Sequence, residues 1–290
     1  MFKGSIVAIV TPFINGAVDE EKLRELVEFQ IGNGTDAIVP CGTTGEASTL
    51  DYDEHMDVIR IVIDQVGKRV PVIAGTGSNA TAEAIELSQK AKDLGADGVL
   101  LVTPYYNKPT QEGLVRHYSA IAAAVAIPQI LYNVPGRTGV NMLPETVARI
   151  AVHKNVVAIK EATGSLQQAS EIIALCGDSI DVFSGDDFIT FPMMACGAKG
   201  IISVLANIMP KAVGDLTDAF FAGDLEKARQ LHLYTLKIGN AMFIESNPIP
   251  VKTALGLMGK CSDELRLPLC PMGEANKVKL AAIMKEYNLI

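Results

Sequence analysis

The chain has 290 residues, of which 49% are hydrophobic, and a formal net charge of -8. This length and apolar content suffice for one sizeable core, whereas the negative charge argues against nucleic acid or an anionic membrane as partner. No apolar run approaches the ~18 residues that a membrane span requires. The first residues show no signal-peptide features, which indicates a cytoplasmic protein.

Short apolar runs rich in β-branched residues alternate with amphipathic stretches over residues 5–223. The expected strands are Ser5–Val10, Asp36–Pro40, Pro71–Ala74, Asp97–Val102, Gln129–Tyr132, Val156–Lys160, Asp181–Ser184 and Lys199–Val204. The expected helices are Asp19–Asn33, Asp51–Gly67, Asn79–Leu94, Gln111–Val125, Leu143–His153, Ser165–Cys176, Asp186–Cys196 and one after Pro210. Eight strand–helix units predict a closed (β/α)8 TIM barrel with parallel strands.

An internal repeat supports this interpretation. A glycine ends a helix and an apolar strand follows at Gly34, Gly95 and Gly197, and each glycine is expected to take a left-handed backbone. An open doubly wound sheet is the alternative, but the first strand–helix turn lacks the glycine fingerprint of dinucleotide-binding folds.

Beyond Gly223 the pattern is purely helical. The expected helices are Leu225–Glu245, Pro250–Leu257 and Glu274–Tyr287. Because the sequence shows no flexible linker, we expect a catalytic barrel over residues 1–223 and a helical extension over residues 224–290 that packs on it. The proline-rich connection, residues 246–252, is expected to be structural.

Lys160 ends an apolar strand, and Ala162-Thr163-Gly164 turns the chain soon afterwards. Side chains at the C-terminal ends of barrel strands point into the active site. Apolar surroundings disfavour the ammonium form, so the pKa should fall and leave an amine able to form a Schiff base with a ketone. The alternative is a lysine that merely reaches solvent from the end of a strand.

Several loops after other strands carry polar side chains. Thr43 and Thr44 lie in a glycine-flanked turn suited to a small anion, or are part of a plain turn. Tyr105 and Tyr106 form a proline-flanked tip that suits a subunit interface, an active site or both. Tyr132 ends the strand before that of Lys160 and should lie beside it, where a phenol can move protons.

The loop after Tyr132 contains Arg137, whose guanidinium can bind a carboxylate through two hydrogen bonds. Gly185 allows close approach of the backbone to a ligand. Asp186 and Asp187 resemble a metal-binding pair, but their position favours capping of the helix that follows. The five cysteines are odd in number and form no C-x-x-C pair, so reduced cytosolic thiols and no metal site are expected.

The chain resembles the dihydrodipicolinate synthase / N-acetylneuraminate lyase family from end to end. The resemblance rests on the segments GTTGE at 42–46, VTPYYNKP at 102–109, YNVPGRTG at 132–139, IKEATG at 159–164, SGDD at 184–187 and NPIPVK at 247–252. It implies a lyase that joins pyruvate to L-aspartate-4-semialdehyde without a cofactor, through a pyruvate imine on Lys160. It also implies a homotetramer built as a dimer of dimers.

The resemblance further implies individual roles. Tyr132, Thr43 and Tyr106 would relay protons, with Tyr106 reaching in from a neighbouring subunit. Thr44, with Thr43, would hold the pyruvate carboxylate, and Arg137 would bind the semialdehyde carboxylate. Gly185 and Ile202 would contact bound pyruvate.

In lysine-sensitive relatives a second site lies at the dimer interface, behind the catalytic mouth, and feedback inhibition by L-lysine is the corresponding expectation. The matching positions are Ser48, His55, Gly77, Asn79, Glu83 and Tyr105. Glu83 and Asn79 suit an ammonium, and Tyr105 and His55 can donate to a carboxylate. Tyr52 departs from the pattern, because sensitive relatives can carry histidine there.

Two other functions stay open at this point. A sister lyase acting on a sialic acid or a 2-keto-3-deoxy sugar acid would share Lys160 and Tyr132, but it would need groups that bind hydroxyls. A non-catalytic binding protein on the same barrel would not need an imine-forming amine. Arg137 and the Thr43–Thr44 pair favour a short substrate that carries a carboxylate.

Overall fold

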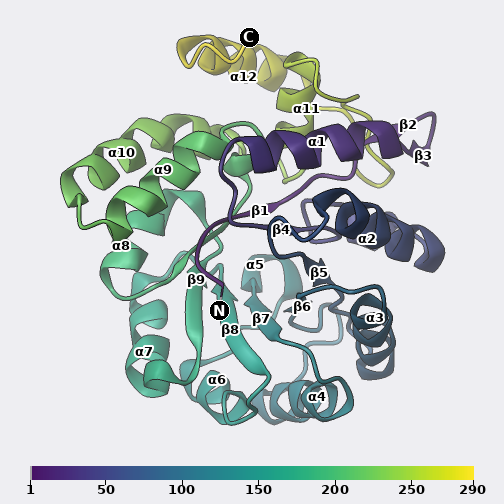
Figure 1. Cartoon of the computed structure of the whole chain (residues 1–290), viewed down its shortest axis with the longest axis vertical. Helices are drawn as coiled ribbons and strands as arrows, with labels where there is room; N and C mark the ends of the chain where they lie inside the picture. The colour runs from purple at the N-terminus through teal and green to yellow at the C-terminus, as the bar shows by residue number, and fades with distance from the viewer. Residues whose placement is uncertain (1) are drawn as a thin grey trace.

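The computed structural model describes residues 2–290, and eight parallel strands form the wall of a barrel (Figure 1). They are β1 (Gly4–Ala8), β4 (Ala37–Val39), β5 (Ile73–Gly75), β6 (Gly98–Val102), β7 (Gln129–Asn133), β8 (Val156–Glu161), β9 (Asp181–Ser184) and β10 (Gly200–Ser203). Their order is β4-β1-β10-β9-β8-β7-β6-β5. A parallel bridge between Ile38 and Val72 joins the two ends of this order and closes the barrel. The TIM-barrel prediction is confirmed, and the open-sheet alternative is wrong.

Helices surround the strands as an outer ring (Figure 1). They are α1 (Glu20–Gly32), α2 (Tyr52–Val66), α3 (Thr81–Asp93), α4 (Gln111–Ala124), α6 (Pro144–Ile150), α7 (Leu166–Cys176), α8 (Thr190–Ala195) and α9 (Pro210–Phe221). The sequence missed only short elements: the hairpin of β2 (Phe13–Ile14) and β3 (Ala17–Val18), the single-turn α5 (Pro135–Thr138) and three 3-10 turns; a fourth 3-10 turn lies inside the expected helix Asp186–Cys196. The 3-10 turns are η1 (Ala47–Thr49), η2 (Gly177–Ser179), η3 (Asp187–Ile189) and η4 (Leu205–Asn207). These elements are too short to show a periodic pattern.

Local signals set the ends of several helices. The Asp19 carboxylate accepts from the backbone N–H of Lys22 and caps α1, as expected. Gly34, Gly95 and Gly197 all have positive φ, of 82°, 94° and 118°. Each glycine therefore turns the chain from an outer helix back into a strand, which confirms the repeat.

The strands divide the core into two layers. Side chains such as Ile6, Ile130 and Phe183 fill the barrel interior, whereas Ile159 packs in the larger core that includes the surrounding helices. Because neighbouring residues of a strand face opposite sides, Lys160 faces the same side as Ala158, which lies in the interior cluster. Lys160 is thus aimed into the barrel at its C-terminal end.

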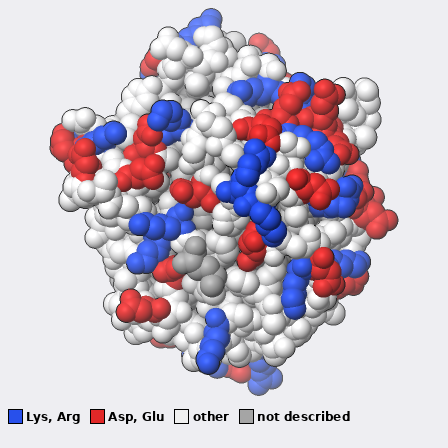
Figure 2. Space-filling model, in the orientation of Figure 1, with Lys and Arg blue, Asp and Glu red and all other residues white. Residues whose placement is uncertain are grey.

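Three further helices complete the chain: α10 (Leu225–Ala241), α11 (Ile249–Leu257) and α12 (Glu274–Glu286). Helix α10 packs against α9, and α11 packs against α12. Helix α10 ends four residues earlier than expected, and the division at residue 223 stays a prediction. Within residues 2–290 we find no helix with the length and apolarity to cross a membrane. Acidic and basic side chains are interspersed over the face shown in Figure 2.

Candidate active site

Lys160 and Tyr132 are register partners on the adjacent strands β8 and β7. Both residues are buried, and the Lys160 ammonium nitrogen lies 4.4 Å from the centroid of the Tyr132 ring. The expected pairing of amine and phenol is confirmed as geometry. Because each side chain extends from the end of a rigid strand, their separation is set by the sheet.

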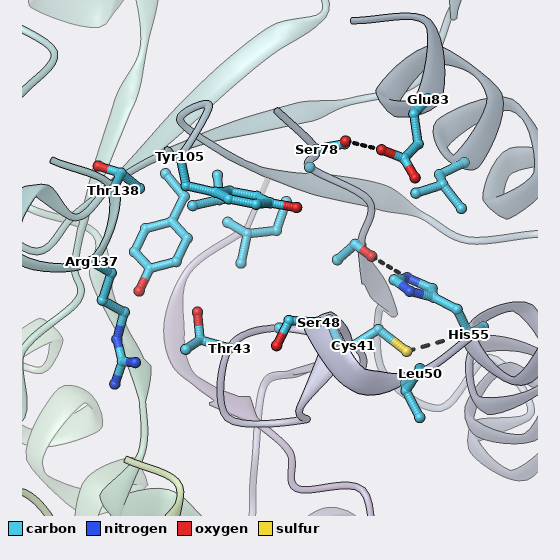
Figure 3. Close-up of a pocket in the computed structure, with 18 of the residues that line it drawn as sticks. Cys41, Thr43, Ser48, Leu50, His55, Ser78, Glu83, Tyr105, Arg137 and Thr138 are labelled. Carbon is cyan, nitrogen blue, oxygen red and sulfur yellow. Dashed lines mark hydrogen bonds between the residues drawn. The ribbon is translucent and has the colours of Figure 1, made fainter. Parts of the chain in front are cut away.

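Beside this pair lies a cavity of about 530 Å³. Its lining includes Tyr132, Thr43 and Arg137. It also includes five of the residues that we expected to bind L-lysine: Ser48, His55, Gly77, Glu83 and Tyr105. In Figure 3, Arg137 and Thr43 lie toward one end, and Glu83 and His55 lie toward the other. Lys160 does not line the cavity directly; the Tyr132 ring does. Residues that the sequence analysis assigned to two separate sites therefore line one continuous cavity within a single chain.

The turn after β4 is closed by its own backbone. Gly42 and Thr43 carbonyls accept from the N–H groups of Gly45 and Glu46 at 3.1 Å each. Thr43 lines the cavity, whereas Thr44 is buried and its hydroxyl accepts from the Asn247 side-chain amide at 3.0 Å. The two threonines thus differ: one faces the open space and the other anchors the turn.

Asn247 was missed by the sequence reasoning, which treated residues 246–252 as structural. Besides contacting Thr44, its backbone carbonyl accepts from the Arg137 guanidinium at 2.9 Å. The side-chain oxygen of Asn247 is buried and has no hydrogen-bond partner. One residue therefore connects the loops after β4 and β7, and the NPIPVK segment was the only signal of it in the sequence.

Asp187 does not cap its own helix, which corrects the expectation. Its carboxylate accepts from the Ser203 hydroxyl at 2.6 Å and from the N–H groups of Val204 and Leu205 at 3.2 Å each. It therefore holds the loop after β10. Asp186, at the N-cap position, makes no side-chain capping bond either.

The Asp186 carboxyl lies close enough to Lys160 for an electrostatic interaction between them. Burial raises the pKa of Asp186 to about 6, against the opposing effect of the Lys160 ammonium. Within residues 2–290, no group of three or more His, Cys, Asp or Glu side chains is placed to hold a metal ion.

Gly185 and Ile202 lie near the ends of β8 and β7 but are not part of the cavity lining. A Cβ at Gly185 would lie 2.5 Å from the Ala162 Cβ. Glycine is therefore required at this position by the close approach of the chain after β8; the expected approach of a ligand to its backbone stays a prediction. Ile202 is fully buried in the barrel interior with Tyr132 and Phe183.

Tyr106 is not brought to the other catalytic candidates within one chain. Its side chain is 91% exposed, and its φ of 72° is uncommon for a residue other than glycine. Its neighbour Tyr105 lines the cavity instead. The tip thus has one tyrosine turned inward and one presented to the outside.

Not all of the residues that we expected to bind L-lysine line the cavity. Glu83 accepts a hydrogen bond from the Ser78 hydroxyl. Burial, together with the hydrogen bond and charge of Glu83, raises the pKa of Tyr52 to about 12. Asn79 lies outside the lining and donates to the Tyr105 carbonyl at 3.2 Å. These contacts put a carboxylate, the counter-ion of an ammonium, at this end of the cavity.

His55 does not fit the role of carboxylate donor that we expected. Its Nε2 lies 2.7 Å from the Gly75 carbonyl, which can only accept. Burial also lowers the pKa of His55, so its neutral form has no second N–H to donate.

Comparisons with known proteins agree along the whole chain. Residues 1–287 match the model of the dihydrodipicolinate synthetase family. The 4-hydroxy-tetrahydrodipicolinate synthase of Geobacter sulfurreducens is 89% identical, with 100% of both chains covered.

Two solved structures share the fold. A chloride-inhibited dihydrodipicolinate synthase from Acinetobacter baumannii, complexed with pyruvate, is 50% identical with a TM-score of 0.98, over 100% of both chains. The enzyme from Cyanidioschyzon merolae with lysine bound is 39% identical with a TM-score of 0.96, over 100% of this chain and 99% of that one. The chain therefore belongs to the dihydrodipicolinate synthetase family.

Proposed function

We propose that the chain condenses pyruvate with L-aspartate-4-semialdehyde to 4-hydroxy-tetrahydrodipicolinate, the first committed step of diaminopimelate and lysine biosynthesis. The observation that carries the proposal is the buried pair Lys160 and Tyr132, with Nζ 4.4 Å from the ring, beside a cavity. The name and 89% identity of the Geobacter relative support it.

The chemistry begins at the Lys160 nitrogen. The free amine attacks the ketone carbon of pyruvate, and the carbinolamine loses water to form an imine. Loss of a methyl proton gives an enamine, whose carbon attacks the aldehyde carbon of the semialdehyde. The substrate's own amine then displaces Lys160 and closes the ring. Because the protonated imine accepts the electron pair, no separate cofactor is needed.

The remaining residues bind substrates and move protons in this scheme. Tyr132 and Thr43 carry protons to and from the carbinolamine oxygen, together with Tyr106. The Thr43–Thr44 turn holds the pyruvate carboxylate, and Arg137 binds that of the semialdehyde. Gly185 and Ile202 support the strand ends around bound pyruvate.

Tyr106 is exposed in the single chain, so we propose that it enters the site of a neighbouring subunit. We place the enzyme in the cytoplasm as a homotetramer, a dimer of dimers. The five unpaired cysteines suit a reducing compartment.

The test of the covalent step is reductive trapping. Pyruvate with borohydride should add a reduced pyruvyl group to Lys160, visible as a modified peptide by mass spectrometry. Lys160→Ala should remove the adduct and most of the activity while the chain stays folded. Lys154→Ala, at an exposed lysine before the same strand, is the matched control. An adduct on another lysine, or none, would exclude this mechanism.

We also propose that L-lysine inhibits the enzyme by binding at the Glu83 end of the cavity. The Glu83 carboxylate would pair with an ammonium, and the Tyr105 hydroxyl would donate to a carboxylate. Ser48 and Gly77 would complete the site, Asn79 would hold the backbone of Tyr105 beside it, and His55 would pack against it. Because Tyr105 precedes Tyr106, ordering the first would disturb the proton relay of the second.

A titration with lysine at fixed pyruvate tests this regulation. Wild-type activity should fall at millimolar lysine, and Glu83→Ala should be much less sensitive. Glu86→Ala is the control, because Glu86 lies on the same helix but pairs with Lys90 on the surface. Equal inhibition of wild type and Glu83→Ala would place the lysine site elsewhere.

A further inference from the structure

Glu46 and Lys252 form an ion pair that is sealed inside the molecule. The Lys252 ammonium donates to the Glu46 Oε1 atom at 2.7 Å, and both side chains have 0% exposure. Glu46 ends the turn that contains Thr43 and Thr44, whereas Lys252 lies in α11, 206 residues later. The pair therefore ties the proposed pyruvate-binding turn to the C-terminal helices.

Both charges have further partners. Oε2 of Glu46 accepts from the backbone N–H of Arg266 at 3.1 Å. The Lys252 nitrogen lies 4.1 Å from the centroid of the Phe13 ring. Burial lowers the pKa of Lys252, and the Glu46 carboxylate opposes that effect. A direct ionic hydrogen bond, supported by further contacts of both groups, is the condition under which a buried ion pair is tolerated.

Net stability is a poor explanation for this pair. Apolar side chains of similar volume often stabilise a core as well as a buried ion pair does. What ionic hydrogen bonds add is direction, because they require fixed positions of donor and acceptor. The backbone at Glu46 has φ 54° and ψ 36°, a left-handed conformation that is uncommon outside glycine. The side-chain contacts hold the chain in this conformation.

The constraint on Glu46 extends directly to the turn. Its backbone N–H donates to the Thr43 carbonyl, and the preceding Gly45 carbonyl accepts from the Thr11 hydroxyl at 2.7 Å. On the other side, Asn247 donates to the Thr44 hydroxyl. Contacts from the loop after β1, from the segment before α11 and from α11 itself thus hold the turn at Thr44, Gly45 and Glu46.

We infer that Glu46 and Lys252 are positioning residues for pyruvate binding, through which the C-terminal helices hold the Thr43–Thr44 turn in its binding geometry. The inference rests on the proposed function, because it assigns the pyruvate carboxylate to this turn. Neither side chain touches substrate, so the pair acts through the backbone of the turn.

The experiment compares Glu46→Gln, Lys252→Met and the double variant with wild type. Lys237→Met is the control, since it removes an exposed ion pair with Glu286 in the same C-terminal region. The first readout is the pyruvate concentration that gives half-maximal borohydride trapping on Lys160. KM for each substrate and the thermal unfolding midpoint are measured alongside.

We expect Glu46→Gln to raise half-saturating pyruvate by about tenfold or more, which corresponds to about 1.4 kcal/mol. KM for the semialdehyde should change much less, and Lys237→Met should match wild type. Lys252→Met leaves a buried carboxylate unpaired and should unfold at a lower temperature. The double variant removes both charges, so it should recover thermal stability but keep the weak pyruvate binding.

Several outcomes would overturn the inference. One is a folded Glu46→Gln with wild-type pyruvate saturation, and another is an equal rise in KM for both substrates. A double variant that recovers both pyruvate binding and stability would show that the two charges only neutralise each other and do not position the turn. Failure of all three variants to fold would assign the pair to folding alone. If wild type itself shows no adduct on Lys160, the proposed function fails instead.

Discussion

The guanidinium of Arg137 donates a hydrogen bond to the protein backbone, and Arg137 also lines the cavity. One Nη2 hydrogen bond goes to the Asn247 carbonyl, while the residue lines the cavity. A carbonyl cannot neutralise the charge, so the guanidinium keeps its capacity to bind a carboxylate. At the residue scale, Asn247 therefore orients the Arg137 guanidinium without neutralising its charge.

Arg137→Ala should weaken use of the semialdehyde far more than use of pyruvate. A hydrogen bond to a charged group contributes about 1.5–3 kcal/mol, so KM for the semialdehyde should rise by roughly one to two orders of magnitude. Steady-state kinetics with each substrate varied in turn measure this. Arg116→Ala, on the exposed face of α4, is the control, and equal effects on both substrates would contradict the role.

Glu161 shows how a residue next to Lys160 stabilises the fold. Its carboxylate is buried and accepts from the Asn133 and Gln168 amides and from the Thr163 N–H. Burial raises the pKa of Glu161 against these hydrogen bonds. Because Asn133 follows Tyr132, this network fixes the ends of β7 and β8 together.

At the scale of elements, the contact between the ends of β8 and β9 depends on glycine. The Gly185 N–H donates to the Glu161 carbonyl at 2.8 Å, and an added Cβ would meet the Ala162 Cβ at 2.5 Å. The strand ends would have to separate to admit even one methyl group. Lys160 lies one residue before Glu161, so it would move with them.

Gly185→Ala should therefore lower both stability and kcat. Overpacking of this kind costs about 1–3 kcal/mol, measurable by urea unfolding. The double variant Gly185→Ala with Ala162→Gly removes the worst contact and should recover part of both losses. A single variant with wild-type stability and turnover would show that the strand ends yield freely.

At the scale of the whole molecule, one chain does not bring together the three hydroxyls of the proposed relay. Tyr132 and Thr43 line the cavity, but Tyr106 is 91% exposed. The proposed relay therefore requires a second copy of the chain to supply its third hydroxyl.

Complementation between chains tests that arrangement. Tyr106→Phe and Lys160→Ala should each be inactive or nearly so, yet mixed oligomers of the two should regain activity. In a hybrid, a chain with intact Lys160 receives Tyr106 from its neighbour. Native mass spectrometry verifies that hybrids form. Inactive hybrids would mean that each site is built from one chain.

The sequence by itself determined the architecture, because its signals are local and repeated. Apolar runs, caps such as Asp19 and the glycines after helices each act within a few residues. The pairing of Lys160 with Tyr132 also followed, since neighbouring parallel strands bring equivalent ends together. Short elements such as α5 were not predicted, because a single helical turn is too short to show a hydrophobic period.

Only the tertiary structure decided which distant residues complete the site. Asn247 and Lys252 lie about 200 residues beyond their partners Thr44 and Glu46, and no local pattern encodes such contacts. The same holds for Asp187, which caps a loop of another strand, and for His55, whose N–H is taken by Gly75. A side chain's role depends on which polar groups the fold brings within hydrogen-bond distance, and that depends on the packing of the whole barrel.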